Sequence, residues 1–501
     1  MKIKAVICLI VLIHASHLYG QNKYDFNGVE SKVNQAIENN EIPSIVVAIA
    51  KDGKIIYEKA FGFSDIENKI KATTSTSYQL ASVSKSLTAT GIMVLNHKNI
   101  VDIDASAEKY MLPYKFIANE GNASDVKLRN LLNHTSGLGT YAEVDYADDE
   151  YTVNSFEMGF KKYGNLFYPP GEICEYSNIG YGLLGYIISK QSGKTFSKFM
   201  EQEVFRPLGM KNSFVDKTNN SDILIAKKYD SNLKQYPEII NNTAGAGNIY
   251  SSIHDLILFG MFNLNNGKQN ILSKEEIDMM HNYVNENTFY PIGHYGLGWF
   301  FNPNDNGYKA VWHEGGMPGV SSMIKLIPEK NIAIAVIMNN FNQPLCQEIT
   351  NDLSKIILPE YNPSPIDGSA NNKYYTSDST YFGDWKGMIK VDSLDIPCTL
   401  KIQSDGNIII DYLDFTLKSY LLGNSPLPRK TFLYFGSVNN NSFSGLFPGD
   451  LPSDDIRHEF SQLMSLKLLK NGNILSGAIV AFPATDKMIY GYPFYIRLEK
   501  Q

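Results

Sequence analysis

The chain has 501 residues, a length typical of two or three domains. Hydrophobic residues make up 43% and charged residues 19%, which excludes a disordered chain. The 52 acidic residues outnumber the 45 basic ones, and the net charge of −7 argues against a nucleic-acid-binding surface. Beyond the N-terminus, no apolar stretch approaches the roughly 20 residues that a membrane-spanning helix needs. The composition indicates a soluble, globular protein with no transmembrane span.

The first twenty residues have the pattern of a secretory signal peptide. Two lysines precede an apolar run over residues 5–13, and the small residue Gly20 stands at the end of the twenty-residue segment. The alternative, a buried N-terminal helix, is disfavoured because the run is not amphipathic. We expect cleavage after Gly20, with Ala15 as a competing site, and therefore a secreted or periplasmic protein. Cys8 lies inside the apolar run, which argues against a lipoprotein anchor.

Hydrophobic periodicity predicts strands at both ends of a long N-terminal part, around a helical middle. In chain order we expect a helix at residues 27–40, strands at 45–50 and 54–61, a helix after Ser82, a helix at 177–191, and strands at 319–327 and 332–338. Asp52-Gly53 between the first two strands is typical of a tight hairpin turn. Strands from distant segments indicate one sheet flanked by helices, an α+β fold.

The composition changes after residue 357. Residues 359–379 are rich in Pro, Asn, Ser and Asp and predict a linker. Short strands with Asp-Gly and Asn-Gly turns follow, which predicts an antiparallel, barrel-like β-domain. These strands are expected at 385–391, 398–402, 408–413, 433–436, 466–469, 474–482 and 490–498. We divide the chain into a signal peptide at 1–20, a first domain at 21–358, a linker at 359–379 and a β-domain at 380–501.

The cysteines and histidines indicate neither a disulfide framework nor a metal site. Cys174, Cys346 and Cys398 remain after signal cleavage, an odd and widely spaced set that leaves one bridge open. We expect Cys174 to be a buried, inert thiol. The nine histidines show no zinc-type spacing.

A serine and a lysine three residues apart, Ser82 and Lys85, form the first candidate catalytic group. On a helix this spacing brings both side chains to one face. A serine at pH 7 is a poor nucleophile and needs an adjacent base. Lysine can be that base where desolvation and a helix N-terminus lower its pKa. Because both residues are common, the pair has meaning only together with other motifs.

Two further motifs follow. Tyr176-Ser177-Asn178 precedes an expected helix, and a tyrosine near a lysine can exchange a proton with the nucleophile or the leaving group. Asn178 is suited to orient a substrate carbonyl or the lysine. The segment 313–316 (HEGG) precedes an apolar strand, where glycines let the backbone approach a ligand and offer an N–H to an oxyanion.

The three motifs in this order resemble those of the serine β-lactamase and penicillin-binding superfamily. The likeness is greatest to class C β-lactamases, their DD-peptidase relatives and the related esterases, and it extends over residues 25–357. Flanking segments agree, namely residues 131–138 (LLNHTSGL), 205–210 (FRPLGM), 295–299 (YGLGW) and 327–331 (IPEKN).

The resemblance implies roles for the motif residues. Ser82 would be the acylated nucleophile and Lys85 its main base, while Tyr176 would protonate the leaving group and activate water for deacylation. The backbone N–H groups of Ser82 and Gly316 would form the oxyanion hole. The substrate-binding positions would be Asn178, His313, Gly315 and Gly316. The resemblance also implies a β-lactamase-like antiparallel sheet flanked by helices, a helical subdomain, and no metal or organic cofactor.

The third motif departs from the family. Its members commonly have Lys-Thr-Gly or His-Thr-Gly there, whose cation and hydroxyl hold a substrate carboxylate. Here His313 is mostly neutral at pH 7, and Glu314 adds a negative charge if it faces the cleft, although strand alternation leaves its orientation open. We expect weak β-lactam turnover, a preference for neutral or amine-bearing acyl substrates, and improved turnover of a chromogenic cephalosporin by Glu314→Thr.

The function predicted is a secreted or periplasmic serine hydrolase that cleaves amide or ester bonds of a small-molecule or peptide substrate through an acyl-enzyme. Within the fold, the alternative is a true class C-type β-lactamase or a DD-carboxypeptidase. From another class, a catalytically silent sensor or binding protein is disfavoured because the three catalytic residues are present. Specificity is expected in loops at residues 141–154 and 285–291, which carry no readable code, and the sequence leaves the oligomeric state open.

The role of the β-domain is open between ligand recruitment and a stabilising unit that shapes the cleft, and we favour the second. Residues 382–385 (FGDW) resemble the entry to a lipocalin-like barrel. Among the remaining motifs, we interpret His134 as structural and His254-Asp255 as a helix cap. The segment 245–247 (GAG) lacks the strand and helix of a dinucleotide-binding unit.

Overall fold

The computed structural model describes residues 24–147, 155–215, 222–267, 271–282, 289–290, 293–364, 378–404, 408–412, 431–432, 434–439, 442–456, 462–483 and 489–501. The expected signal peptide, most of the expected linker and parts of both expected specificity loops lie outside these ranges. None of the helices in the described ranges is both long and apolar enough to cross a membrane.

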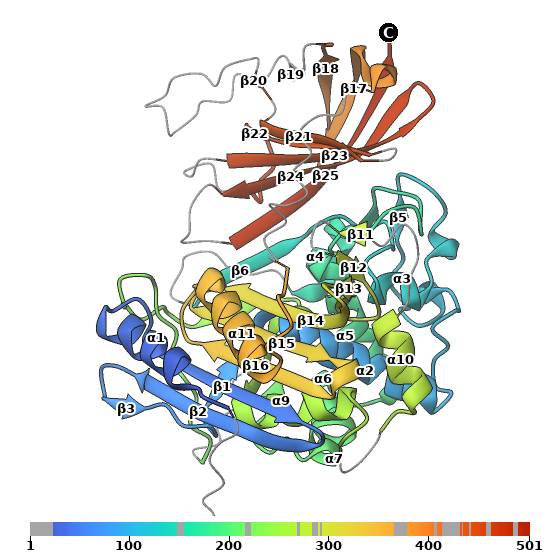
Figure 1. Ribbon diagram of the computed structural model, residues 1–501. Helices are drawn as coiled ribbons and strands as arrows, with labels where there is room; N and C mark the ends of the chain where they lie inside the picture. The colour runs from blue at the N-terminus through green and yellow to red at the C-terminus, as the bar shows by residue number, and fades with distance from the viewer. Residues whose placement is uncertain are drawn as a thin grey trace, which may run out of the picture.

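Nine of the described strands form one antiparallel sheet in the N-terminal part, in the order β11-β12-β13-β14-β15-β16-β1-β2-β3 (Figure 1). The central strand β1 pairs with β2 on one side and with β16 on the other, so the sheet joins the two ends of this part of the chain. The predicted α+β class is confirmed. The strands are β1 (Ser44–Lys51), β2 (Lys54–Asp65), β3 (Ile70–Lys71), β11 (Phe289–Tyr290), β12 (Gly293–Tyr295), β13 (Phe300–Asp305), β14 (Tyr308–Met317), β15 (Val320–Ile327) and β16 (Ile332–Met338).

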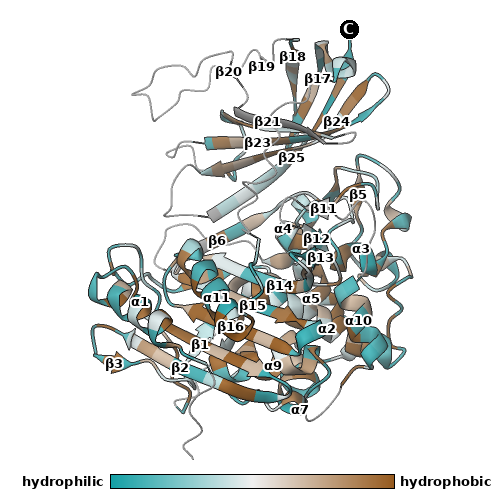
Figure 2. Ribbon diagram, in the orientation of Figure 1, coloured by the Kyte–Doolittle hydropathy of each residue, from teal (hydrophilic) through white to brown (hydrophobic). Residues whose placement is uncertain are grey.

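Helices cover both faces of this sheet (Figure 1). Helices α1 (Asn27–Glu38) and α11 (Gln343–Ile357) share a core with one face, while α2 (Ser84–His97), α5 (Asn178–Ser192) and α9 (Ile253–Asn263) share a core with the other. Alternate residues of β1 enter different cores: Val47 packs on the α1 side and Val46 on the α2 side. Because both faces are buried, β16 is apolar throughout and β1 is apolar between its polar ends, Ser44 and Lys51, as Figure 2 shows.

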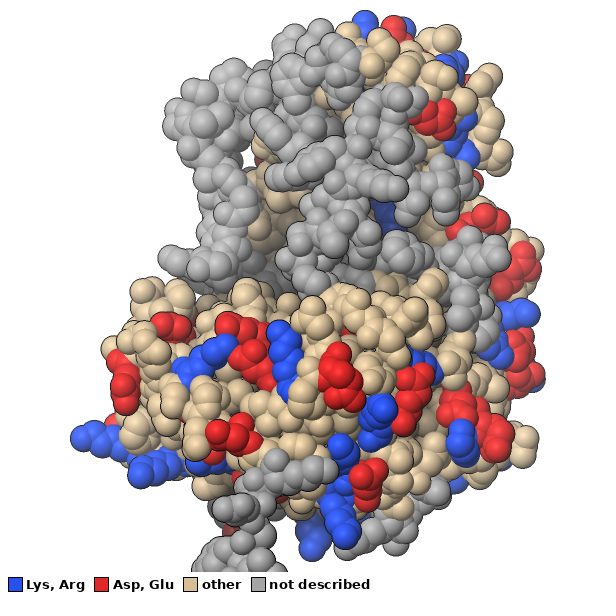
Figure 3. All heavy atoms as spheres, viewed as in Figure 1, with Lys and Arg blue, Asp and Glu red and all other residues tan. Residues whose placement is uncertain are grey.

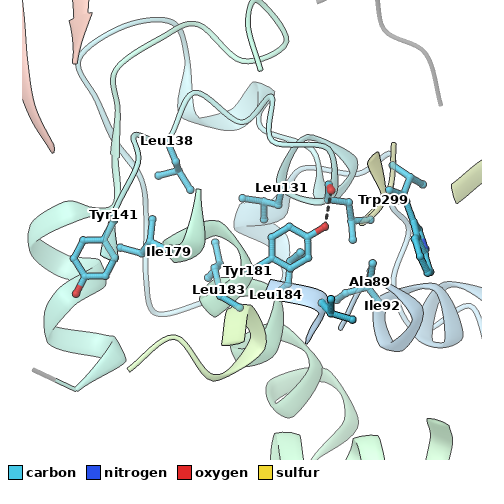
Figure 4. Packing of buried hydrophobic residues seen from close by; sticks show 14 of the residues in the cluster. Ala89, Ile92, Leu131, Leu138, Tyr141, Ile179, Tyr181, Leu183, Leu184 and Trp299 are labelled. Carbon is cyan, nitrogen blue, oxygen red and sulfur yellow. Dashed lines mark hydrogen bonds between the residues drawn. The ribbon is translucent and has the colours of Figure 1, made fainter. Parts of the chain in front are cut away.

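The other helices and short strands build a subdomain beside the sheet. Figure 4 shows its packing around Tyr181 of α5, whose hydroxyl donates to the Leu132 carbonyl oxygen at 2.7 Å. The elements are β4 (Ser77–Gln79), η1 (Ala81–Val83), η2 (Ala107–Lys109), β5 (Ile117–Ala118), η3 (Ala123–Asp125), α3 (Leu128–Leu132), α4 (Phe156–Tyr163), β7 (Asn165–Leu166), α6 (Phe196–Met200), η4 (Glu201–Phe205), α7 (Arg206–Leu208), β8 (Phe214–Val215), α8 (Ala244–Gly247), β10 (Ile249–Ser252) and α10 (Lys274–Asn282). The short helix η6 (Pro328–Lys330) instead forms the turn between β15 and β16 of the sheet.

The C-terminal strands form a second antiparallel sheet, curved into a half-barrel, in the order β20-β19-β18-β17-β25-β24-β23-β22-β21 (Figure 1). The predicted all-β class of this part is confirmed, although strands β20 and β22 were not among those predicted. The elements are η8 (Ser379–Tyr381), β17 (Gly383–Val391), β18 (Leu394–Ile402), β19 (Ile408–Asp411), β20 (Thr431–Phe432), β21 (Tyr434–Asn439), β22 (Ser442–Pro448), β23 (Gln462–Asn471), β24 (Ile474–Pro483) and β25 (Ile489–Lys500).

One strand connects the two parts of the molecule. Strand β6 (Ala142–Tyr146) lies between β25 of the half-barrel and β9 (Ile239–Asn241) of the N-terminal part, and it pairs with both. The stacked rings of Tyr163 and Tyr492, 5.1 Å apart, extend the same contact, and the half-barrel core is continuous with that of the N-terminal part. The prediction of a loop at residues 141–154 was therefore wrong for β6, because strands distant in the sequence create it.

Candidate active site

The nucleophile candidate lies at the junction of a short turn and a helix. Ser82 is the central residue of η1, which leads directly into α2, and Lys85 is in the first turn of α2. Lys85 Nζ donates to Ser82 Oγ at 3.0 Å. Ala81 has a positive φ of 45°, a conformation that non-glycine residues rarely adopt and that is found at functional sites. The predicted helix start and the shared face of the two side chains are confirmed.

Lys85 is fully buried, and its surroundings favour the uncharged amine. Its Nζ donates to the Ala246 carbonyl oxygen at 3.1 Å and lies 4.7 Å from the ring centre of Tyr176. Burial holds the pKa of Lys85 well below its ordinary value. A neutral amine 3.0 Å from a serine hydroxyl can accept its proton, as general-base activation requires.

The second motif converges on the same lysine. Ser177 caps α5, its Oγ accepting from the Gly180 N–H, so Tyr176 stands just before the helix. The Tyr176 ring packs 4.3 Å from the ring of His134, whose Nδ1 accepts from the Ser177 N–H at 3.1 Å. Burial, with Lys85 nearby, holds the pKa of His134 well below its usual range, so His134 is a neutral ring that positions Tyr176. Asn178 Nδ2 donates to the Tyr141 carbonyl oxygen at 3.0 Å.

The glycines of the third motif lie against the nucleophile segment. A Cβ on Gly315 would lie 2.2 Å from the Leu80 carbonyl oxygen and 3.0 Å from the Ser82 nitrogen, so the close approach of strand β14 to η1 requires glycine there. Gly316 lines the same cleft as Ser82. Their backbone N–H groups thus belong to adjoining segments at one cleft, as an oxyanion hole needs.

The other two residues of that motif do not line the cleft. His313 is fully buried, with Nδ1 donating to the Glu314 carbonyl oxygen at 2.7 Å and Nε2 accepting from the Tyr295 hydroxyl at 2.9 Å. Burial, with Lys85 nearby, lowers the pKa of His313 to about 3, so the ring is neutral. The Glu314 carboxylate accepts from Gln347 (2.9 Å) of α11, on another side of the strand. The Glu314 side chain therefore does not face the cleft, which was the condition for its predicted effect on β-lactam turnover and substrate charge preference.

The cleft in front of Ser82 has a volume of about 430 Å³. Its walls come from η1, from strand β6, from the start of α5, from the α8 region and from the end of β14. The lining residues are Ala81, Ser82, Ala142, Glu143, Val144, Asn178, Asn241, Thr243, Ala246, Gly247, Gly316 and Met317. Within the described ranges, no group of three or more His, Cys, Asp or Glu side chains is arranged to hold a metal ion.

The Beta-lactamase family model matches residues 29–355, nearly the whole N-terminal part. The chain belongs to the Beta-lactamase family. The protein flp of Staphylococcus aureus (strain N315) is 24% identical over 370 residues, which cover 72% of this chain and 70% of that protein. The octameric penicillin-binding protein homologue from Pyrococcus abyssi superposes with a TM-score of 0.58 at 23% identity, covering 94% of this chain and 100% of its own. A class C β-lactamase from Rhodobacter sphaeroides superposes with a TM-score of 0.56 at 18% identity. The superposition covers 66% of this chain and 99% of the β-lactamase chain.

Two features of this Beta-lactamase family site were not anticipated. The glycine-rich segment at α8, set aside as an incomplete nucleotide motif, supplies the Ala246 carbonyl to Lys85, and Gly245 lets α8 approach α5 because a Cβ there would lie 2.3 Å from the Tyr181 carbonyl oxygen. The signal available in the sequence was the run of three small residues at 245–247, which is typical of a segment packed closely against a helix. The second feature is Glu143 in the cleft wall. No local sequence pattern indicated it, because its strand β6 forms only by pairing with β9 and β25, which are distant in the sequence.

The half-barrel contacts the segment that carries Tyr176. Lys467 Nζ, on β23, donates to Glu175 Oε2 at 2.7 Å and to the Cys174 carbonyl oxygen at 2.9 Å. Thr140 Oγ1 donates to the other carboxylate oxygen of Glu175 at 2.7 Å. The C-terminal part of this family member therefore lies against its candidate active site.

Several minor expectations are also resolved. Cys174, Cys346 and Cys398 are free and buried, and burial raises the pKa of the Cys174 thiol to about 12, in keeping with an inert side chain. Ser252 caps α9 by accepting from the Asp255 N–H, whereas His254 pairs with Glu58, so His254 and Asp255 do not act as a base and its orienter.

Proposed function

We propose that the protein is a serine hydrolase that cleaves amide or ester bonds through an acyl-enzyme on Ser82. The observation that carries this proposal is the 3.0 Å contact between Ser82 Oγ and the amine of Lys85, a fully buried lysine whose pKa burial holds down. In the Beta-lactamase family, relatives of this chain include penicillin-binding proteins and class C β-lactamases.

In acylation, the Lys85 amine accepts the Ser82 proton while Oγ attacks the substrate carbonyl. The negative charge that develops on the carbonyl oxygen is stabilised by the backbone N–H groups of Ser82 and Gly316. Tyr176, in contact with Lys85, passes the proton to the departing amine or alcohol as its bond to the carbonyl carbon breaks. In deacylation, Tyr176 passes its proton to the neutral Lys85 amine and takes one from a water molecule, which attacks the ester carbonyl. As the bond between Ser82 Oγ and the acyl carbon breaks, the Lys85 ammonium returns the proton to Oγ, so that Ser82, Lys85 and Tyr176 all regain their starting states. Asn178, at the cleft wall, orients the acyl group.

The test is mass spectrometry of the enzyme after incubation with a fluorophosphonate, followed by peptide mapping. We expect one adduct on Ser82 and none in Ser82→Ala. An adduct on another residue refutes the assignment, and the lack of any adduct favours the catalytically silent alternative.

Substrate profiling separates the hydrolase activities within the fold. Purified enzyme is compared on p-nitrophenyl esters, D-Ala-D-Ala peptides, D-amino-acid amides and nitrocefin. Because His313 is neutral and lies outside the cleft lining, we expect nitrocefin and the D-Ala-D-Ala peptides to be poor substrates. Turnover of nitrocefin above that of the esters would instead favour a true β-lactamase.

Export and the domain division also remain proposals. The N-terminal pattern supports secretion or transport to the periplasm, and the family match over residues 29–355 supports a first domain at 21–358, followed by a linker at 359–379 and a β-domain at 380–501. N-terminal sequencing of the exported protein tests the first part, with Gln21 expected as the first residue after cleavage at Gly20.

A further inference from the structure

An apolar cluster forms part of the wall of the cleft. Its buried members are Ala81, Met317 and Val320, and Val144 packs against them. Three of the four, Ala81, Val144 and Met317, also line the cleft in front of Ser82. They belong to η1, β6 and β14, which are distant in the sequence. The nucleophile candidate therefore shares its cleft with an apolar surface that the fold assembles from three segments.

Strand β6 directs Val144 and Glu143 to opposite sides. Successive side chains of a strand point to opposite faces. The Glu143 carboxylate accepts from the Tyr141 hydroxyl at 2.6 Å and from Asn242 Nδ2 at 2.7 Å, and Tyr141 lies two residues before it on the same face. Val144 lies on the other face, where it meets the apolar cluster.

The half-barrel fixes the strand that carries Val144. Strand β6 pairs with β25 on one edge and with β9 on the other, and Figure 1 shows it between the half-barrel and the N-terminal part. A strand that is paired on both edges keeps its register and the faces of its side chains. The Val144 side chain is therefore part of a preorganised wall.

The apolar cluster and the candidate proton donor lie toward opposite ends of one stretch of β14. At one end His313 is bonded to Tyr295, whose ring centre lies 6.1 Å from that of Tyr176. At the other end Met317 belongs to the apolar cluster. Between them Gly315 lies against the segment of the nucleophile. Because the leaving group takes its proton from Tyr176, it lies toward the first end, and the acyl group of the substrate points toward Met317.

The surface in view outside the cleft carries charges of both signs. On the face in Figure 3, Lys and Arg side chains are interspersed with Asp and Glu side chains over the N-terminal part. Long-range attraction of a charged substrate requires a region of one sign. The described residues of this face offer no such region, so discrimination between substrates is left to contacts within the cleft.

We propose that Val144 and Met317 are specificity-determining residues that bind an uncharged, apolar acyl group, such as an aliphatic chain. This inference rests on the proposed hydrolase function and names the acyl class of its substrate. Each methylene that the wall removes from water strengthens binding by about fourfold when it is fully buried. The flexible thioether of Met317 lets the wall adapt to chains of different shape.

The experiment compares kcat/KM on the p-nitrophenyl esters of acetic, butanoic and hexanoic acid, which share one leaving group. For the wild type we expect a ratio of butanoate to acetate of about ten. Val144→Thr keeps the branched shape that suits a strand but replaces a methyl group by a hydroxyl, and Met317→Gln keeps the length of the side chain. We expect each variant to lower this ratio about threefold.

A second series varies the leaving group and keeps the acyl group: ethyl, butyl and hexyl acetate, followed by the release of acetic acid. We expect no comparable rise with chain length in this series. A rise here that Val144→Thr removes, together with a flat acyl series, assigns the wall to the leaving group and overturns the proposal.

The matched control is Ile240→Thr, the same change of an aliphatic side chain on the neighbouring strand. Ile240 lies on β9, is 43% exposed and is not among the described lining residues of the cleft. It should keep the wild-type ratio. Equal ratios in the wild type, Val144→Thr and Met317→Gln overturn the proposal. A wild-type ratio near one also overturns it and needs no variant.

Fluorophosphonate labelling of Ser82 in the same preparations separates a failure of this inference from a failure of the proposed function. Labelling of a variant also shows that its active site is folded, and the two variants lie on different strands, so either one suffices for the comparison. Labelling of the wild type without a chain-length preference leaves the hydrolase standing and removes the role of Val144 and Met317. Absence of labelling in the wild type removes both.

Discussion

Lys467 of the half-barrel donates to Glu175, the residue directly before the candidate proton donor Tyr176, at 2.7 Å. The two ends of this ion pair belong to strands and loops almost 300 residues apart, with a partly buried lysine and a nearly buried glutamate. The pair fixes the backbone that enters α5, and so the position of the Tyr176 ring over Lys85. The half-barrel is therefore a structural component of the candidate active site.

Replacing Lys467 by Met tests this component. The change leaves the Glu175 carboxylate with Thr140 as its remaining side-chain donor among the bonds described, and it frees the Cys174 carbonyl. We expect kcat to fall about tenfold while KM changes little, since a small displacement of a proton-transfer group acts on the chemical step. Steady-state kinetics with p-nitrophenyl acetate measures both constants.

The control for this prediction is Lys470→Met on the same strand. Lys470 lies over the ring of Tyr381, within the half-barrel. If the two variants have the same kcat, the effect of Lys467 is one of general stability, and its link to Tyr176 does not hold.

A second prediction concerns Lys85. Arginine is protonated throughout the accessible pH range and cannot serve as a base. We expect Lys85→Arg to lower the rate of Ser82 acylation by about 10²–10⁴-fold, the usual contribution of a general base. Stopped-flow or mass-spectrometric labelling with a fluorophosphonate measures that rate.

The pH dependence of the wild-type enzyme gives an independent check. Because burial lowers the pKa of Lys85 from 10.5, the amine is already deprotonated below the pH at which an exposed lysine would lose its proton. Acylation should therefore reach its full rate at a pH below 10.5 and decline as the pH falls further and the amine takes up a proton. A rate that rises with an inflection near 10.5 would show a charged resting lysine and contradict this assignment.

A third prediction uses the close approach of β14 to η1. Gly315→Ala places a Cβ 2.2 Å from the Leu80 carbonyl oxygen, which also accepts from Ser322 Oγ at 2.6 Å. Since these are backbone and buried atoms, the segment that carries Ser82 must shift. We expect a destabilisation of about 1–3 kcal/mol and a large loss of acylation rate. Urea unfolding and labelling measure the two effects.

Gly316→Ala provides the comparison. Its Cβ would meet the ring of Phe341 at 2.8 Å, but that side chain is 59% exposed and can move away. We expect its loss of stability to be clearly smaller than that of Gly315→Ala. Equal losses would mean that the contact with η1 is not what requires glycine at position 315.

Elements with local signals could be predicted from the sequence. Asp52 and Gly53 both have the positive φ of a hairpin turn, and β1 and β2 lie on either side of them. The predicted helix at 177–191 is α5, which ends at Ser192 and is capped by Gly193 in the left-handed conformation that glycine favours at a helix C-terminus. The serine and lysine of the catalytic motif meet because helical spacing brings them to one face.

The rest of the site depends on distant contacts that leave no local pattern. Strand β6 exists because β9 and β25 pair with it, so Glu143 looked like a loop residue. The orientation of Glu314 followed from the packing of α11 on β14, which alternation along one strand cannot decide. The role of Ala246 is carried by a backbone carbonyl, which any residue type possesses.

A last prediction concerns stability in acid. His281 is fully buried against Trp299, with ring centres 5.3 Å apart, and its Nε2 lies 3.2 Å from Asn263 Oδ1. Burial lowers its pKa from 6.5 to about 3. Between these values the unfolded chain binds a proton that the folded chain does not, so the stability contributed by the neutral ring is present above pH 6.5 and is lost as the pH falls.

We expect His281→Gln, whose amide can still donate to Asn263, to remove this linkage. From pH 7 to pH 5 the free energy of unfolding of the wild type should fall by about 2 kcal/mol more than that of the variant, which is the linkage expected for one proton taken up only on unfolding. Urea unfolding at both pH values, followed by tryptophan fluorescence, measures the difference. If the two proteins lose the same stability over this interval, the folded state already admits the charged ring, and His281 is not held neutral by its packing.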